Sequence, residues 1–373
     1  VAIGLNHTTQ TSTNESAKRK RWLFRSQLQP ECMTQPWRFD GITGRVLWVD
    51  LTAGTCESRD LPHEWCLEHM GGKALATKLL VEWDTTDYDA ATANQHPITE
   101  RMDTASHPTT PLLFMTGPYQ GSKVGSSGRA VVVTRSPLTE CYIDTYIGGN
   151  IGHDLRKAGW DGLFITGASD AWVRLEINDQ EVTLHPAEDL VGKTTWEVEQ
   201  ALSDLGECLS IGPAGEHGSR IASPLTAGRR AAGRGGTGAS FGFKRLKAVT
   251  VKASKEAAAG MRYAEDFSLA EAIKQQRSEM GLRRKSGDPF YAFGTSRGPL
   301  YAAENGRMPT ANYSSTDAQI PDLSALKVGG GAGGQTQEAV KAGAQAVTVA
   351  SSMSTHELSG KHWHESLPDA KQP

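Results

Sequence analysis

Residues 229–253, RRAAGRGGTGASFGFKRLKAVTVKA, decide between two folds for this chain. Gly233, Gly235 and Gly238 match the G-x-G-x-x-G pattern of dinucleotide-binding sites. That pattern belongs to a strand followed by a full helix, and the crossover to the next parallel strand takes about a dozen residues. Here the next strand pattern already begins at Leu246, eight residues after Gly238. The spacing therefore argues against a dinucleotide-binding fold.

The rest of the chain shows more strand patterns than helix patterns. Short β-branched runs bounded by Gly, Pro, Asp or Ser predict strands at residues 45–51, 130–136, 162–168, 172–178 and 246–253. Apolar residues at helical spacing predict helices over residues 74–83 and 194–206, and Thr194 with Glu197 forms a capping box in the second. The strands and helices do not alternate as βαβ units, so the predicted fold class is α+β, built on sheets.

The sequence divides into four parts by composition and periodicity. They are a disordered extension at residues 1–36, a sheet-rich domain at 37–260, the start of a helical second domain at 261–322, and a disordered low-complexity tail at 323–373. Met33 directly precedes the first structured pattern, so residues 1–32 are interpreted as upstream sequence. The tail opens with GGGAGG and continues in alanine, glycine and serine, which leaves little to pack.

The composition is that of a soluble globular protein. With 373 residues, of which 38% are hydrophobic, the chain is long enough for two domains with a proper core. Its formal net charge of -3 argues against a general nucleic-acid binder, which needs a basic excess. No apolar run approaches the roughly 18 to 20 residues of a membrane span, and the N-terminus lacks the apolar core of a secretory signal. The sequence therefore predicts a cytoplasmic protein that binds neither nucleic acid nor membrane.

The cysteines of the chain are scattered. They are Cys32, Cys56, Cys66, Cys141 and Cys208, and no two of them have C-x-x-C spacing. Structural metal sites and clusters need such closely spaced pairs. We therefore expect ordinary reduced thiols and assign no protein ligand to a metal.

Three segments are rich in glycine, at residues 116–130, 147–162 and 229–242. Glycine lets backbone amides approach a ligand without a Cβ in the way, and adjacent arginines give bidentate donors for phosphate. Together the segments predict a site for a phosphate-bearing cofactor, although any one of them could equally be a set of turns. No P-loop motif occurs. Asp161, in the second segment, is interpreted as the cap of a turn.

Six blocks, taken in order, resemble one protein family. They are GRVLWVDLTAGT (44–55), GGKALATKLL (71–80), LLFMTGP (112–118) with SSGRAVVVTRSPLTE (126–140), IGGNIGHDLRKAGWDGLFITG (147–167), SIGPAGE (210–216) and GRRAAGRGGTGASFGFKRLKAV (228–249). From about Trp37 to Ser254 the chain resembles the N-terminal domain of aldehyde ferredoxin oxidoreductases, the tungsten or molybdenum bis-pterin enzymes. A weaker likeness to the start of the family's second domain continues through residues 291–313.

This resemblance implies an oxidoreductase that converts an aldehyde to a carboxylic acid at a tungsten or molybdenum bis-molybdopterin. Electrons would leave through a 4Fe-4S cluster to ferredoxin, and the N-terminal domain would form a sheet base under the two pterins. By the match of motifs, the residues against the pterin and its phosphates would be Arg129, Gly148, Arg230, Ala231, Gly233 and Arg234. The catalytic residues stay unknown.

The chain departs from the family pattern in two places. Tyr146 stands two residues before Gly148, where the family usually has an asparagine that helps arrange magnesium-bridged phosphates, so a Mg site is an open question. The family's cluster cysteines, later pterin loops and acid/base residues are not found in the sequence. The resemblance stops after Pro321, and a shifted frame across residues 343–344 and 346–347 can encode two cysteines in C-x-x-C spacing. We therefore interpret the chain as a truncated or frame-shifted member.

A function of a second class stays open beside the enzyme. The chain could be a non-catalytic, pterin-binding scaffold subunit that needs a partner chain. Metal analysis separates the two, because tungsten or molybdenum together with iron indicates the enzyme, whereas pterin without iron indicates the scaffold. The sequence decides neither the aldehyde nor the metal, and it leaves both a homodimer and a partner subunit open.

Overall fold

The computed structural model describes residues 41–86, 104–228, 230–264, 268–286, 305–307 and 314. The chain divides into two compact units, Val1–Leu269 and Ala270–Pro373. The second unit contains nearly all of helix α9 (Leu269–Lys285). The extension predicted at residues 1–36 and the tail predicted at 323–373 lie outside the described residues. The four-part division of the sequence therefore stays a prediction.

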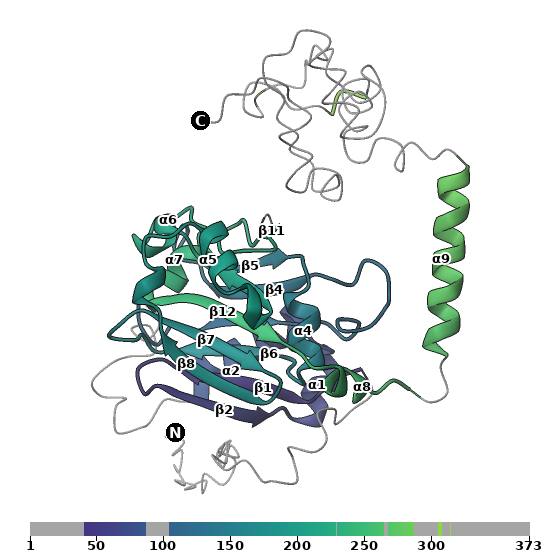
Figure 1. Ribbon diagram of the computed structural model, residues 1–373, viewed down its shortest axis with the longest axis horizontal. Coiled ribbons are helices and arrows are strands. Elements are labelled where there is room, and N and C mark those ends of the chain that lie inside the picture. The colour runs from purple at the N-terminus through teal and green to yellow at the C-terminus, as the bar shows by residue number, and fades with distance from the viewer. Residues whose placement is uncertain are drawn as a thin grey trace, which may run out of the picture. The chain divides into compact units, whose positions relative to one another are not determined.

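Six strands form the first sheet of the N-terminal unit (Figure 1). Their order is β2 (Thr55–Asp60), β1 (Arg45–Asp50), β6 (Gly162–Thr166), β3 (Leu112–Met115), β4 (Ala130–Arg135) and β5 (Tyr142–Ile147). β1 and β6 run parallel, and the other neighbours run antiparallel. β5 is an edge strand of this sheet, and its ladder with β4 ends at the pair Ala130 and Ile147.

A second sheet, also of six strands, faces the first. Its order is β11 (Arg230–Ala231), β10 (Leu225–Thr226), β9 (Glu207–Ser210), β12 (Leu246–Lys252), β7 (Val173–Asn178) and β8 (Glu181–Pro186). β12 runs parallel to β7, and the other neighbours are antiparallel. β11 and β12 are not neighbours, so the glycines between them do not belong to a βαβ unit.

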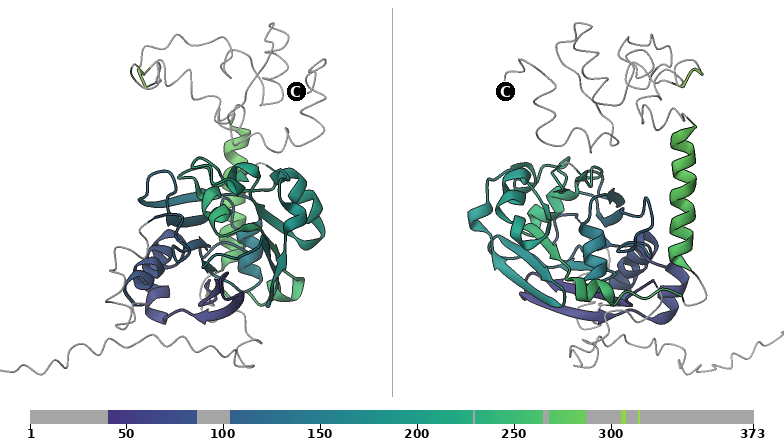
Figure 2. Two further views of the ribbon diagram at one scale, coloured as in Figure 1. Left: turned by 90° about the vertical axis from the view of Figure 1, so that its left-hand side faces the viewer. Right: turned by 45° about the vertical axis from the view of Figure 1, so that its right-hand side comes forward.

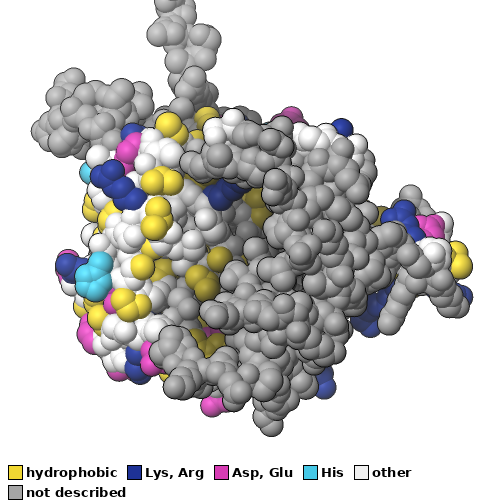
Figure 3. Space-filling model, turned by 90° about the horizontal axis from the view of Figure 1, so that it is seen from above, with side chains coloured by type: hydrophobic (Ala, Val, Ile, Leu, Met, Phe, Trp, Pro, Cys, Tyr) yellow, Lys and Arg dark blue, Asp and Glu magenta, His cyan; other side chains and the backbone are white. Residues whose placement is uncertain are grey.

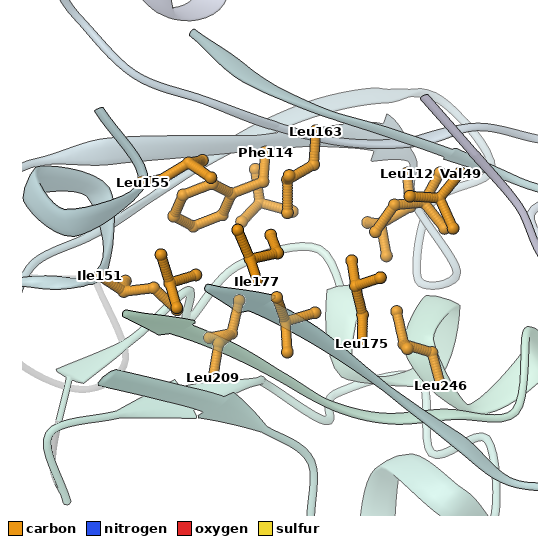
Figure 4. Packing of buried hydrophobic residues seen from close by; sticks show 14 of the residues in the cluster. Val49, Leu112, Phe114, Ile151, Leu155, Leu163, Leu175, Ile177, Leu209 and Leu246 are labelled. Carbon is orange, nitrogen blue, oxygen red and sulfur yellow. The ribbon is translucent and has the colours of Figure 1, made fainter. Parts of the chain in front are cut away.

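The main core lies between the two sheets. Alternate residues of the longer central strands point into it, as the period of two in a strand requires. Figure 4 shows Phe114 and Leu163 of the first sheet opposite Leu175 and Ile177 of the second. All of these side chains are almost fully buried. Burial of this apolar surface on both inner faces holds the sheets together.

Some of the helices cover the outer faces of the two sheets, and one contributes side chains to the core between them (Figure 2). The helices of the unit are α1 (His63–His69), α2 (Gly72–Thr86), α4 (Ile151–Lys157), α5 (Thr195–Ala201), α6 (Pro213–Glu216), α7 (Thr237–Phe243) and α8 (Lys255–Ala259). α1 and α2 bury their apolar faces on the first sheet, where Trp48 stacks on Phe164 with ring centroids 3.8 Å apart. On the second sheet, Val198 of α5 packs against Cys208 and Ala248. No helix among the described residues is long and apolar enough to cross a membrane.

The predicted strands are confirmed as β1, β4, β6, β7 and β12. The helix predicted over residues 74–83 lies within α2. The capping box is also confirmed, since the Thr194 side chain accepts from the Glu197 N–H and the Glu197 carboxylate accepts from the Thr194 N–H. That helix ends earlier than predicted, at Ala201, and a 3-10 turn follows at Ser203–Leu205. The α+β fold class built on sheets is therefore correct.

Helix α7 is an element that the sequence patterns did not predict. Its seven residues include Gly238 and Gly242, which lower helix propensity. A Cβ on Gly242 would overlap the carbonyl oxygen of Gly215 in α6, so the glycine permits the close packing of the two helices. Tertiary packing thus overrides local propensity here.

Candidate functional site

Two of the glycine-rich segments meet at one end of the first sheet. Ala130 and Ile147 form the last register pair of β4 and β5. Arg129 and Gly148 are the next residues outward on the two strands, so they flank the same end of the ladder. Figure 1 shows β4, β5 and β11 close together in this part of the unit.

The third segment reaches this end from the second sheet. Arg230 lies in β11, opposite Thr226 of β10. A Cβ placed on Gly148 would lie 3.6 Å from Arg230 Cδ and 3.8 Å from its Nε, and one on Gly149 would lie 3.9 Å from Arg230 Cγ. The arginine side chain therefore runs along the Gly148–Gly149 backbone, where a larger residue would crowd it. The contact joins the two sheets at the site.

The loop after β11 is fastened to β5. The Arg234 N–H donates to Thr145 Oγ1 at 3.2 Å, and Ser136 Oγ donates to the carbonyl of Gly235 at 2.8 Å. Gly235 has a φ of +74°, and a Cβ on it would lie 2.6 Å from Ile143 Cγ1. Only glycine meets both conditions without strain. These contacts hold the backbone on either side of Arg234 while its side chain stays exposed.

The residues proposed to contact a cofactor form what we call the arginine rim: Arg129, Gly148, Arg230, Ala231, Gly233 and Arg234. Gly148 and Arg230 are half-buried, and the other four are exposed. No atom lies within 4 Å of a Cβ placed on Gly233, so the space before that backbone is open. Figure 3 shows Lys and Arg side chains beside hydrophobic ones on the described part of the face seen from above. The structure brings the six residues together; their contact with a cofactor stays a prediction.

A polar cluster borders the arginine rim on the side of α2. Lys73 Nζ lies 3.6 Å from Asp144 Oδ2, and this carboxylate raises the pKa of Lys73. Tyr146 is 44% exposed, and partial burial followed by its hydrogen bond to Asp144 raises the pKa of its phenol. Tyr146 is therefore protonated at neutral pH and presents a hydroxyl, with one carboxylate beside it that is already paired with a lysine.

The rim has the chemistry of an anion site. Guanidinium groups donate paired hydrogen bonds to phosphate oxygens, and glycine backbone allows a flat or bulky ligand to approach closely. The rim contains no thiol, and its six residues offer no nucleophile. Its arrangement is suited to binding and orienting a ligand rather than to reacting with it.

The described residues do not form a metal or cluster site. No group of three or more His, Cys, Asp or Glu among them lies close enough to hold a metal ion. Burial raises the pKa of Cys56 to about 11 and that of Cys208 to about 12, so both thiols stay protonated at neutral pH. Among the described residues, Cys66 and Cys141 do not form a disulfide either. Cys32 lies outside the described residues.

Several residues that build the rim were not predicted from the sequence to do so. Thr145, Ser136 and Gly235 fasten the third segment, and Gly149 turns the chain with a φ of +91°. A signal existed for Gly149, because paired glycines at a strand end are typical of a backbone with positive φ. Thr145 and Ser136 gave no signal, since their partners lie far along the chain.

The fold and the rim together define a class: a two-sheet domain that presents exposed arginines and open glycine backbone at one edge. Residues 46–253 match the family model described as aldehyde ferredoxin oxidoreductase, N-terminal domain. The chain therefore belongs to the aldehyde ferredoxin oxidoreductase family, through its N-terminal domain. The resemblance carried by the six sequence blocks is confirmed.

The chain is similar to several named proteins. It is 32% identical over 281 residues to the tungsten-containing aldehyde ferredoxin oxidoreductase of Pyrococcus abyssi. This match covers 73% of this chain and 43% of that protein. It is 28% identical over 233 residues to the aliphatic sulfonate oxidoreductase, WOR-like subunit, of Pyrococcus furiosus, over 57% of this chain and 34% of that protein. The chain thus spans less than half the length of these curated relatives.

A solved structure shares the fold. It is the active site complex BamBC of benzoyl coenzyme A reductase in complex with 1,5 dienoyl-CoA. The match has a TM-score of 0.51 at 30% sequence identity and covers 58% of this chain and 31% of that chain. The likeness thus rests on both the fold and the sequence.

Proposed function

We propose that this chain is the cofactor-binding N-terminal part of a tungsten- or molybdenum-dependent oxidoreductase that oxidises an aldehyde to a carboxylic acid. The observation that carries the proposal is the arginine rim, in which three glycine-rich segments from two sheets converge on one edge that carries three arginines. Relatives named as tungsten-containing aldehyde ferredoxin oxidoreductases support the metal and the reaction.

The rim fits the phosphate end of a molybdopterin. When bound, the cofactor supplies the metal at which the aldehyde is oxidised. The chain's own part is to hold it: Arg129 and Arg234 offer exposed guanidinium groups to the phosphates, and Arg230 lies between the two sheets at the centre of the rim. Gly148 and Gly233 let the ligand approach the backbone. These residues bind and orient, and no proton transfer is assigned to them.

The surroundings of Tyr146 do not fit a magnesium site. Magnesium is usually held by one or two free carboxylates and by phosphates in a strict octahedral geometry. Here Asp144 is paired with Lys73, and Tyr146 is a protonated phenol. We therefore derive no step through a magnesium ion in this chain.

We propose electron transfer for the whole protein and not for the described residues alone. We propose ferredoxin as the electron acceptor and a 4Fe-4S cluster as the route, with a continuation of the chain or a partner subunit supplying what the described residues lack. The described residues fit no cluster, so none of them is given a role in that route. We also propose a cytoplasmic location for the protein.

A second candidate function is a pterin-binding scaffold subunit without activity of its own. It is favoured by the names of two similar proteins, one a WOR-like subunit and the other the active site complex BamBC, which indicate that such domains occur in multi-subunit proteins. In this case the arginine rim has the same ligand, and a partner chain completes the site. A homodimer is the other assembly to be tested.

Cofactor content tests the proposal. The chain is produced in cells that supply molybdenum and tungsten, and metal, iron and pterin are measured on the purified protein beside the variants Arg230→Gln and Lys255→Gln. Lys255 is exposed on α8 and serves as the matched control for loss of one positive charge. Tungsten or molybdenum with iron supports the enzyme, and pterin without iron supports the scaffold. A chain without pterin, or retention unaffected by Arg230→Gln, contradicts the proposed site.

A further inference from the structure

His153 of α4 lies against the loop that leads into Arg129. Its Nδ1 accepts a hydrogen bond from the Gly121 N–H at 2.8 Å. At the other end of the loop, a Cβ placed on Gly128 would lie 3.3 Å from His153 Nε2. The imidazole thus contacts the loop near both of its ends, and Gly128 directly precedes Arg129.

The helix that carries His153 is firmly held. Ile151 and Leu155, on either side of it in α4, point into the main core and are almost fully buried (Figure 4). A side chain between them therefore starts from a fixed backbone. By contrast, the Ser122 and Ser127 hydroxyls donate within the loop itself, to the carbonyls of Tyr119 and Val124, although Ser122 also bonds the Tyr263 side chain.

We propose that His153 is a positioning residue that holds the 117–129 loop, and with it Arg129, through an imidazole Nδ1 that accepts the Gly121 N–H. The role of the loop in placing Arg129 for a ligand rests on the proposed function, whereas the contact between His153 and the loop does not. Gly121 itself has a φ of +83°, and a Cβ on it would lie 2.8 Å from Met261 Cε and 3.3 Å from Arg156 Cγ. The glycine is therefore enclosed, and its N–H is directed at the ring.

The hydrogen bond requires a neutral ring. When Nδ1 accepts, the single proton of neutral imidazole sits on Nε2, whereas the protonated ring has donors at both nitrogens and cannot accept. Burial first, and then Lys157, lower the pKa of His153 below its ordinary value, while Asp154 opposes the change. The ring is therefore neutral at pH 7.

The charged groups around the ring come from several elements. On α4, Lys157 forms an ion pair with Asp154 at 2.9 Å, and the stem of Arg156 packs on Gly121. Farther from the ring, on β9, Glu207 accepts from Asn150 at 3.1 Å, and burial, together with the nearby Asp154, raises the pKa of Glu207. The phenol of Tyr263 interacts with Ser122 of the loop. Since folding lowers the pKa of His153, the neutral hold is present above that pKa and is lost as the pH falls through it.

Hydrogen exchange of the loop tests this proposal in the absence of any cofactor. Amide exchange of the peptide over residues 117–129 is measured at pH 7.5 and at the lowest pH at which the chain stays folded, corrected for intrinsic rates, on the wild-type chain and on His153→Asn and His153→Leu. The Asn Oδ1 occupies the place of Nδ1 and accepts at every pH. We expect protection in the wild type to fall about three- to tenfold on acidification, the range set by one hydrogen bond. His153→Asn keeps protection at both pH values, and His153→Leu lacks it at both.

Equal protection of the three proteins at both pH values would overturn the proposal. If His153→Leu does not fold, the pH dependence that distinguishes wild type from His153→Asn still decides it. A second arm titrates the same proteins with inorganic pyrophosphate at pH 7.5, where His153→Leu should bind more weakly than His153→Asn. Should none of them bind pyrophosphate while the exchange pattern holds, the proposed function fails and the positioning role stands.

Discussion

The molecule contains two groups of arginines with opposite surroundings. Arg45 and Arg156 are fully buried: Arg156 donates to the carbonyls of Gly41 at 2.9 Å and Gly117 at 3.1 Å and pairs with Asp161, and Arg45 lies over the ring of Trp160. The rim residues Arg129 and Arg234 are exposed.

Burial and bonding partners distinguish the arginines that stabilise the fold from those that are exposed at the rim. The residue type alone does not distinguish them. Burial lowers the pKa of Arg156 to about 9, so its guanidinium is still charged at neutral pH and needs the partners it has. Buried charges of this kind hold segments of the fold in place. The exposed charges of the arginine rim contribute little to stability and are available to a ligand.

Removing the buried carboxylate should have the largest effect. Asp161 accepts from the N–H groups of Thr43 at 2.9 Å and Gly44 at 2.8 Å besides pairing with Arg156. Asp161→Ala leaves a buried guanidinium without its counter-charge, which costs about 3 to 5 kcal/mol. Urea denaturation followed by circular dichroism measures the change in the free energy of unfolding. A loss below about 1 kcal/mol would show that the buried pair does not hold the fold.

Gly235 and Gly233 of the third segment differ in the same way as the buried and exposed arginines, since the first is enclosed and the second is open. Gly235→Ala places a Cβ against Ile143 in a left-handed conformation, so we expect a loss of stability of about 2 to 4 kcal/mol. Gly233→Ala meets no atom, and its stability should change by less than about 0.5 kcal/mol. Thermal unfolding of both variants checks this. We expect Gly233→Ala to lower cofactor retention instead. Equal melting temperatures of Gly235→Ala and Gly233→Ala would contradict the different roles of the two glycines.

Neutralising one rim arginine should act on the ligand alone. Arg234→Gln removes a charge-assisted hydrogen bond to phosphate, worth about 1.5 to 3 kcal/mol, so pyrophosphate affinity should fall about tenfold or more. The melting temperature should match that of the wild type, because the Arg234 backbone contact to Thr145 is retained. Isothermal titration gives the affinity, with Lys255→Gln as control. The same fall in both variants would indicate a general charge effect.

The sequence predicted the parts of this molecule that depend on local pattern. β1, β4, β6, β7 and β12 are short apolar runs, and the capping box at Thr194 needs only residues three apart. β5 was not predicted, because Tyr142, Asp144 and Tyr146 place polar and aromatic groups on an exposed face of an edge strand. Family motifs predicted the six rim residues. The β4–β5 register brings Arg129 and Gly148 together, whereas contacts with Gly148 and Thr145 bring in the segment of Arg230 and Arg234.

Long-range contacts could not be read from the sequence. Asp161 was interpreted as a turn cap, but its carboxylate bonds Thr43 and Gly44 more than a hundred positions earlier in the chain. Likewise, the bond from Gly121 to His153 joins two segments that are 32 residues apart. Such partners are set by the packing of the two sheets, and no local pattern encodes them.

The central claim, that the arginine rim holds a phosphate-bearing cofactor, is tested most directly by pyrophosphate titration of one multiple variant. The wild-type chain, the variant Arg129→Gln/Arg230→Gln/Arg234→Gln and the control Lys255→Gln are compared by isothermal titration at one ionic strength. We expect binding by the wild-type chain and the control, and no detectable binding by the triple variant, whose cooperative thermal unfolding shows that it is still folded. Equal affinity in all three proteins would contradict it.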